Sequence, residues 1–121
     1  MSSSETAELL GYVDQLVRTT RDGLIQWQRP NPTTFSWSTQ GPPIGAVVIQ
    51  RVERRRLPTM PPEDYVLQVL DPQYGTSPRV MLEGEKDRVV FEKLKELYET
   101  IASSISRKNL DFFRSILPKP G

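Results

Sequence analysis

The chain contains neither cysteine nor histidine among its 121 residues. The absence of cysteine excludes disulfide bonds, thiolate metal sites and cysteine nucleophiles. Without histidine and cysteine the chain can form no Ser-His-Asp or Cys-His triad, no HExxH metalloprotease site and no ordinary zinc site, because each of them uses an imidazole or a thiolate. Carboxylate pairs, carboxylate-held magnesium and serine or lysine chemistry remain as catalytic possibilities.

An excess of one charge and a long apolar run are also missing. Lys and Arg number 16 and Asp and Glu 15, so the net charge is +1 and no global field directs the chain toward nucleic acid or membranes. No apolar stretch approaches the roughly 18 residues that span a bilayer, and the acidic N-terminal segment lacks the pattern of a secretory signal. We expect a single domain, 1–121, in the cytoplasm, with no role at a membrane.

The most regular pattern in the chain lies between Glu85 and Ser106. Apolar residues recur there at helical spacing, at Val90, Leu94, Leu97, Ile101 and Ile105. Charged residues occupy the opposite side, which is typical of an amphipathic helix that buries one face. A first helix is predicted over about Glu5–Arg21, with a capping box at Ser2–Glu5 and Gly23 as its left-handed C-terminal cap.

Between these helices, segments rich in β-branched and aromatic residues alternate with proline- and glycine-containing breaks. The predicted strands cover Leu24–Arg29, Thr33–Ser38, Ile44–Val52, Tyr65–Leu70 and Arg79–Glu83. Their short links do not permit parallel crossovers, so we predict the α+β class, with an antiparallel meander of four or five strands flanked by both helices. Trp27, Phe35 and Trp37 are expected in the core, with an exposed aromatic binding surface as the alternative.

After Ser106 the pattern changes, and Lys108-Asn109 is predicted to cap or kink the long helix. A short terminal helix then carries five large apolar side chains, at Leu110, Phe112, Phe113, Ile116 and Leu117. Phe112 and Ile116 lie on a different side of this helix from Leu110, Phe113 and Leu117. We therefore expect one of these two sets to fold back on the domain and the other to face water. The candidate residues for self-association, as a two-fold dimer, are Phe112, Phe113, Ile116 and Leu117. The alternative is that the segment wraps over the sheet and buries both sets.

Three segments carry a resemblance to other proteins: LVRTTRDGLIQW (Leu16–Trp27), YVLQVLDPQYGTSPRVML (Tyr65–Leu82) and FEKLKELYETIASSI (Phe91–Ile105). They resemble a group of small uncharacterised bacterial proteins in which a helix ends in a Thr-x-x-Gly-x-hydrophobic-x-Trp turn and leads into a β-meander. A helix with an LxELY motif, here Leu94–Tyr98, closes the domain in that group. The resemblance implies a bacterial α+β domain and brings no catalytic residue. The long Arg- and Pro-rich loop of this chain, which follows Arg51, departs from the compact meander expected for that group.

That loop begins with a cluster of arginines, Arg51, Arg54, Arg55 and Arg56, and continues into the proline-dense segment Leu57–Pro62. Guanidinium groups bind carboxylates and phosphates in bidentate geometry, so the cluster is a candidate site for an acidic protein partner or for nucleic acid. A solvated strand end is the alternative. Nucleic-acid modules usually add interleaved aromatic residues or a broader basic face, and neither is evident in this sequence.

The remaining candidates for chemistry are the carboxylates around the last predicted hairpin, Asp71, Glu83, Glu85 and Asp87. Their spacing matches no known metal loop, and turn or helix-start positions account for three of them. We therefore expect no enzyme and no cofactor or metal. We interpret the chain as a non-enzymatic protein–protein interaction module, such as an adaptor, an immunity- or antitoxin-type inhibitor or an accessory subunit. The alternative is a nucleic-acid-associated accessory protein that uses the Arg51–Arg56 loop.

Overall fold

The computed structural model describes residues 3–53, 62–75 and 77–119. In chain order the elements are α1 (Ser3–Arg21), β1 (Gln28–Asn31), β2 (Thr34–Ser38), β3 (Ala46–Glu53), β4 (Glu63–Leu70), the 3-10 turn η1 (Pro72–Tyr74), β5 (Val80–Glu83), the 3-10 turn η2 (Gly84–Lys86) and α2 (Arg88–Ile116). The strands form one antiparallel sheet in the order β1-β2-β3-β4-β5, so each strand pairs with its neighbour along the chain. The predicted α+β meander is confirmed.

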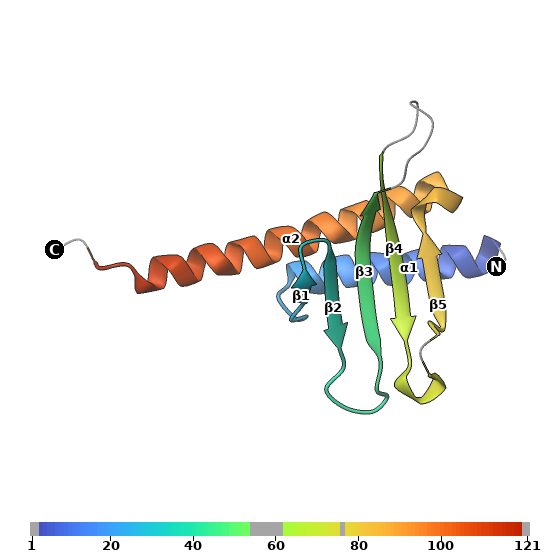
Figure 1. Cartoon of the computed structure of the whole chain (residues 1–121), viewed down its shortest axis with the longest axis horizontal. Coiled ribbons are helices and arrows are strands. Elements are labelled where there is room, and N and C mark those ends of the chain that lie inside the picture. Colours follow the sequence, from blue (N-terminus) through green and yellow to red (C-terminus); the bar gives the residue numbers. More distant parts are fainter. Residues whose placement is uncertain (1–2, 54–61, 76, 120–121) are drawn as a thin grey trace.

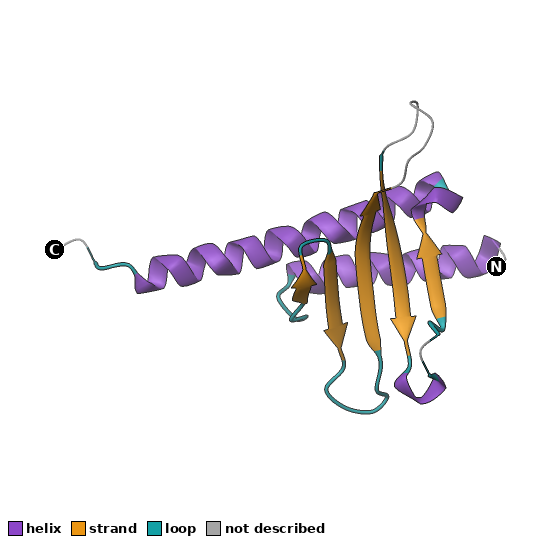
Figure 2. Cartoon of the chain, viewed as in Figure 1, coloured by secondary structure: helices purple, strands orange, loops and turns teal. Residues whose placement is uncertain are grey.

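Both helices cover the same face of the sheet, as Figures 1 and 2 show. Alternate strand residues point toward them, among them Phe35 of β2 and Ile49 of β3, which are fully buried. Leu94, Leu97 and Ile101 of α2 are also 0% exposed, as the helical pattern predicted. The apolar stripe of α2 and one face of the meander therefore form a single core.

α1 packs against both α2 and the core. It contributes Val13 and Val17, which are buried with the side chains of α2 and the sheet. At the edge of this contact, Lys93 of α2 donates a hydrogen bond to the Asp14 carboxylate over 2.8 Å. That hydrogen bond raises the pKa of Lys93. The two helices thus form one layer beneath the sheet.

The end of α1 follows the predicted glycine cap. Gly23 has φ 75°, and the backbone N–H of Leu24 donates to the Thr19 carbonyl over 3.0 Å while the N–H of Gly23 donates to Thr20 over 3.1 Å. This is the paired bonding of a Schellman motif, which favours glycine because its backbone adopts positive φ without a side-chain clash. Ser2, the first residue of the predicted capping box, lies outside the described residues.

The segment after the cap was predicted to be a strand, and this prediction is wrong for Leu24–Trp27, since β1 begins at Gln28. The segment between α1 and β1 is held in place by the Trp27 side chain and not by β-sheet hydrogen bonds. The indole N–H of Trp27 donates to the Thr20 hydroxyl over 2.9 Å, and the two tryptophans, Trp27 and Trp37, have ring centroids 6.4 Å apart. Trp27 and Phe35 are buried and Trp37 is partly buried against the core, so these three aromatic residues belong to the core as expected and do not form an exposed surface.

α2 is a single helix, which corrects the prediction of a separate short terminal helix after Lys108-Asn109. Its start is capped by Asp87, whose carboxylate accepts from the backbone N–H of Val89 over 2.8 Å. No glycine or proline occurs between 88 and 117, so nothing in that range forces the helix to stop. Leu117 leaves the helical conformation with ψ 144° because the residue before a proline, here Pro118, disfavours the α region.

A candidate protein-binding surface at the end of α2

We call residues 106–117 the α2 extension. Figure 1 shows α2 continuing past β1, so that the extension leaves the body of the domain. The apolar stripe of α2 is fully buried at Ile101 and partly buried at Ile105. From Ser106 to Lys119 every residue is exposed. Near its start the extension contacts the domain, where the Lys108 ammonium donates a hydrogen bond to the side-chain oxygen of Gln26. From there the helix projects into solvent.

The extension carries a large apolar surface. Its exposed fractions are 57% for Leu110, 67% for Phe112, 58% for Phe113, 61% for Ile116 and 49% for Leu117. The expectation that one set folds back on the domain is wrong, and so is the alternative that both sets are buried. The reason is the uninterrupted helix, whose fixed rise of about 1.5 Å per residue carries these side chains beyond the edge of the sheet.

These side chains form one broad face. Successive residues of an α-helix are separated by about 100°, so Phe112 and Ile116 continue the azimuth of the buried Ile101. Leu110, Phe113 and Leu117 widen that stripe to an arc of roughly 160°. A second side of the extension is polar and carries Arg107, Asp111 and Arg114. The extension is thus amphipathic, and its apolar face lies beyond the sheet that covers the same face earlier in α2.

The extension and the residues after it are basic. Between 107 and 119 the chain holds four basic residues, Arg107, Lys108, Arg114 and Lys119, and one acidic residue, Asp111, which gives a net charge of +3. The rest of the chain has a net charge of −2, because the whole chain has a net charge of only +1. A partner of this surface therefore meets both apolar side chains and positive charge.

The predicted arginine cluster is placed only in part. Arg51 lies on β3 with its guanidinium carbon 5.7 Å from the centroid of the Tyr98 ring, on the side of the sheet that faces α2. This contact is a cation–π pair with the core edge. Arg54, Arg55 and Arg56 lie outside the described residues. The cluster as a binding site stays a prediction.

The carboxylates of the last hairpin have structural partners. Asp71 accepts from the backbone N–H of Gln73 over 2.9 Å and pairs with Arg79 over 3.1 Å. Asp87 caps α2, and Glu83 lies 3.9 Å from Lys86. Among the residues that the structure describes, no group of three or more Asp, Glu, His or Cys side chains is arranged to hold a metal ion.

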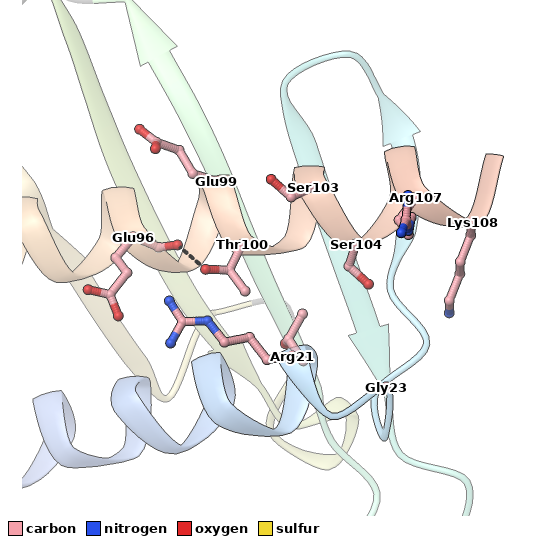
Figure 3. A pocket seen from close by; sticks show the side chains of 10 residues that line it. Arg21, Gly23, Glu96, Glu99, Thr100, Ser103, Ser104, Arg107 and Lys108 are labelled. Carbon is pink, nitrogen blue, oxygen red and sulfur yellow. Dashed lines mark hydrogen bonds between the residues drawn. The ribbon is translucent and has the colours of Figure 1, made fainter. Parts of the chain in front are cut away.

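A groove of about 610 Å³, lined mainly by polar and charged residue types, lies between the end of α1 and the middle of α2 (Figure 3). Figure 3 shows Arg21 reaching from α1 toward Glu96 and Thr100 of α2, with Ser103 and Ser104 farther along the helix. The Thr100 hydroxyl donates to the Glu96 carbonyl over 2.7 Å. Hydroxyl groups and charges of both signs suit the polar contacts of a binding surface. The sequence analysis missed this groove because α1 and α2 bring together residues about 80 positions apart.

A second groove, which we call the α1/β5 groove, lies between the start of α1 and β5 and has a volume of about 260 Å³. Apolar and charged side chains line it, namely Leu9, Tyr12, Val80 and Met81 with Glu5, Glu8 and Arg79. Tyr12 is 54% exposed and Met81 40% exposed. The Tyr12 hydroxyl donates to the Glu8 carboxylate over 2.9 Å, and this hydrogen bond to Glu8 raises the pKa of Tyr12.

Sequence reasoning missed the α1/β5 groove as well. One signal was present, because Tyr12 is a large aromatic residue outside the stripe that Val13 and Val17 form on α1. The other half of the groove, on β5, is distant in sequence and is brought to α1 only by the fold. An aromatic residue on the polar side of a helix is thus the one local indication of this surface.

Comparison with known proteins gives no relative: no family model, no curated protein and no solved structure matches the chain. The resemblance to small bacterial proteins therefore stays a prediction. None of the helices in the described part of the chain combines the length and the apolar character needed to cross a membrane.

Proposed function

We propose that this chain is a non-enzymatic protein–protein interaction module and that the α2 extension is its contact surface. The observation that carries the proposal is the exposure of five large apolar side chains on the part of α2 that projects beyond the sheet. Large exposed apolar patches on soluble domains mark interaction sites, because leaving them in water is unfavourable. Roles as an adaptor, an inhibitor of the immunity or antitoxin type or an accessory subunit each use such a surface.

The size and chemistry of the patch support this role. From the exposed fractions, the five residues offer roughly 600 Å² of mostly apolar surface, about three-quarters of one partner's share of a standard interface. Aromatic residues and arginine are enriched in interfaces, and the extension combines Phe112 and Phe113 with Arg107 and Arg114. A preformed helix also loses less conformational entropy on binding than a disordered segment does. The cytoplasmic location and bacterial origin expected from the sequence stay part of this proposal.

The test is recovery of a partner by the wild-type chain and its loss with the double variant Phe112→Asp/Phe113→Asp. The matched control is Ile44→Asp/Val89→Asp, which also replaces two exposed apolar side chains, 57% and 55% exposed, that lie neither on the extension nor among the residues that line either groove. We expect the control to bind as the wild type does. A partner counts only if it binds again as a purified protein. Equal binding by both double variants would overturn the proposal.

The nucleic-acid alternative has its own test. Binding to generic DNA and RNA is titrated with salt, since neutralising phosphates makes affinity fall steeply as salt rises. We expect no such binding. A steep salt dependence that disappears when the four arginines Arg51, Arg54, Arg55 and Arg56 are replaced by alanine would favour the alternative over the protein-binding role.

A further inference from the structure

We propose that the partner of the α2 extension is a second copy of this chain, bound head to tail, with the extension of one copy in the α1/β5 groove of the next. This inference rests on the proposed function of the extension. The sequence suggested a two-fold dimer in which two extensions pair with each other. The arrangement proposed here instead joins two different surfaces. Three observations support it: the positions of the two surfaces, their apolar composition and their opposite charges.

The two surfaces lie at opposite ends of the molecule. In Figure 1 the extension leaves the domain beyond β1, whereas the N-terminal end of α1 and β5 lie at the other end. An extension of about 12 residues is roughly 18 Å long, so it projects away from the groove of its own chain. Contact between them therefore joins two copies. In a head-to-tail dimer one copy keeps an unoccupied groove and the other a free extension, so further copies can bind at both ends.

The groove offers apolar surface that matches the extension. Tyr12 and Met81 are half exposed at its mouth, with Leu9 and Val80 beside them. An unbranched methionine adapts to the shape of an entering side chain, and aromatic rings pair favourably in tilted geometry. Phe112 and Phe113 of the extension are the side chains that we assign to this groove. Burying them removes the largest exposed apolar groups of the extension from water.

The charges of the two surfaces are opposite. The segment 107–119 has a net charge of +3. The groove is bordered by Glu5 and Glu8, while its one cation, Arg79, is paired with Asp71 over 3.1 Å. A two-fold pairing of extensions would bring +3 against +3, and juxtaposed like charges are unfavourable. Charge complementarity therefore selects the groove of a second copy over a second extension.

The area is sufficient for a reversible contact. Roughly 600 Å² of extension surface, covered by a similar area of the groove and its surroundings, gives about 1,200 Å² in total, the lower end of specific interfaces. Because the two surfaces differ, the interface is heterologous, and repeated contacts build an open chain or close into a ring. The affinity also falls as salt screens the attraction between the charges.

Sedimentation velocity on two variants tests this arrangement. The extension variant is Phe112→Asp/Phe113→Asp, and the groove variant is Glu8→Arg/Met81→Arg, which places positive charge where the basic extension would dock. Ile44→Asp/Val89→Asp again serves as the control. We expect the wild type and the control to form oligomers that grow with concentration, and each of the two test variants alone to be monomeric. An equimolar mixture of the two test variants should form a dimer that does not grow, because only one intact pair of surfaces remains.

Other outcomes overturn the inference. If the groove variant alone associates like the wild type while the extension variant stays monomeric, the contact is a pairing of extensions. If the wild type stays monomeric at tens of micromolar, there is no self-association, while loss of another purified partner with the extension variant would still support the proposed function. Far-UV circular dichroism checks folding, and Tyr12→Ala with Phe112→Ala provides a gentler second pair of variants to which the same expectations apply.

Discussion

Leu97→Ala tests whether α2 holds the domain together at its centre. Leu97 is 0% exposed and lies between the equally buried Leu94 and Ile101. The substitution removes about three buried carbon groups, which costs roughly 2–2.5 kcal/mol in transfer free energy. A residual cavity adds to this, because neighbours anchored on a helix and a sheet relax only partly, and we expect a loss of about 3–5 kcal/mol.

The matched control is Leu110→Ala, the same substitution on the same helix. Leu110 is 57% exposed on the extension, so we expect a loss of less than about 0.5 kcal/mol for this surface position. Both values come from denaturant unfolding followed by circular dichroism, at a concentration low enough to avoid association. A loss below about 0.5 kcal/mol for Leu97→Ala, or equal losses at the two sites, would refute the packing described for α2.

Three further predictions concern the cap of α2, a buried tyrosine and the arginine cluster. Asp87→Ala removes the side chain that accepts from the first turn of α2 and should lower the free energy of unfolding by about 1 kcal/mol, measured by urea denaturation. Burial raises the pKa of Tyr65 to about 12, so the folded state keeps a proton that the unfolded state releases above pH 10. The free energy of unfolding should therefore fall between pH 10 and 12, and Tyr65→Phe should lose less over the same window; equal losses would contradict this assignment. Replacing Arg51, Arg54, Arg55 and Arg56 together by alanine should leave the chain folded and lower the melting temperature by only a few degrees, because Arg51 is exposed and its contact with the Tyr98 ring contributes about 0.5–1 kcal/mol; an unfolded variant would show that the arginines are structural.

Local sequence patterns predicted the fold well because a few neighbouring residues are enough to indicate each helix, cap and strand. The spacing of Leu94, Leu97 and Ile101 marks the buried stripe of a helix, and all three side chains are fully buried. Gly23 marks the end of α1 because the cap requires positive φ, and its φ is 75°. The strands followed from alternation, and the meander followed from their short links. Each of these signals is contained in a short stretch of sequence.

The surfaces proposed to bind partners depend on distances that a sequence pattern does not contain. The stripe of α2 shows which face is apolar, but not that the sheet ends near Ile105 while the helix continues to Ile116. Asn109 was interpreted as a break, although one residue of modest helix propensity costs well under 1 kcal/mol and an intact helix tolerates it. The α1/β5 groove joins Tyr12 to Met81, which only the fold brings together.

The most direct test of the central claim compares the full chain with a version that ends at Lys108, by sedimentation equilibrium. The shorter chain keeps Ile101 and Ile105 but lacks every large apolar side chain that the extension exposes. We predict that the full chain associates at about tens of micromolar and that the shortened chain is folded and monomeric. A shortened chain that associates as strongly as the full chain, or that no longer folds, would contradict the claim that the extension serves binding and not the fold.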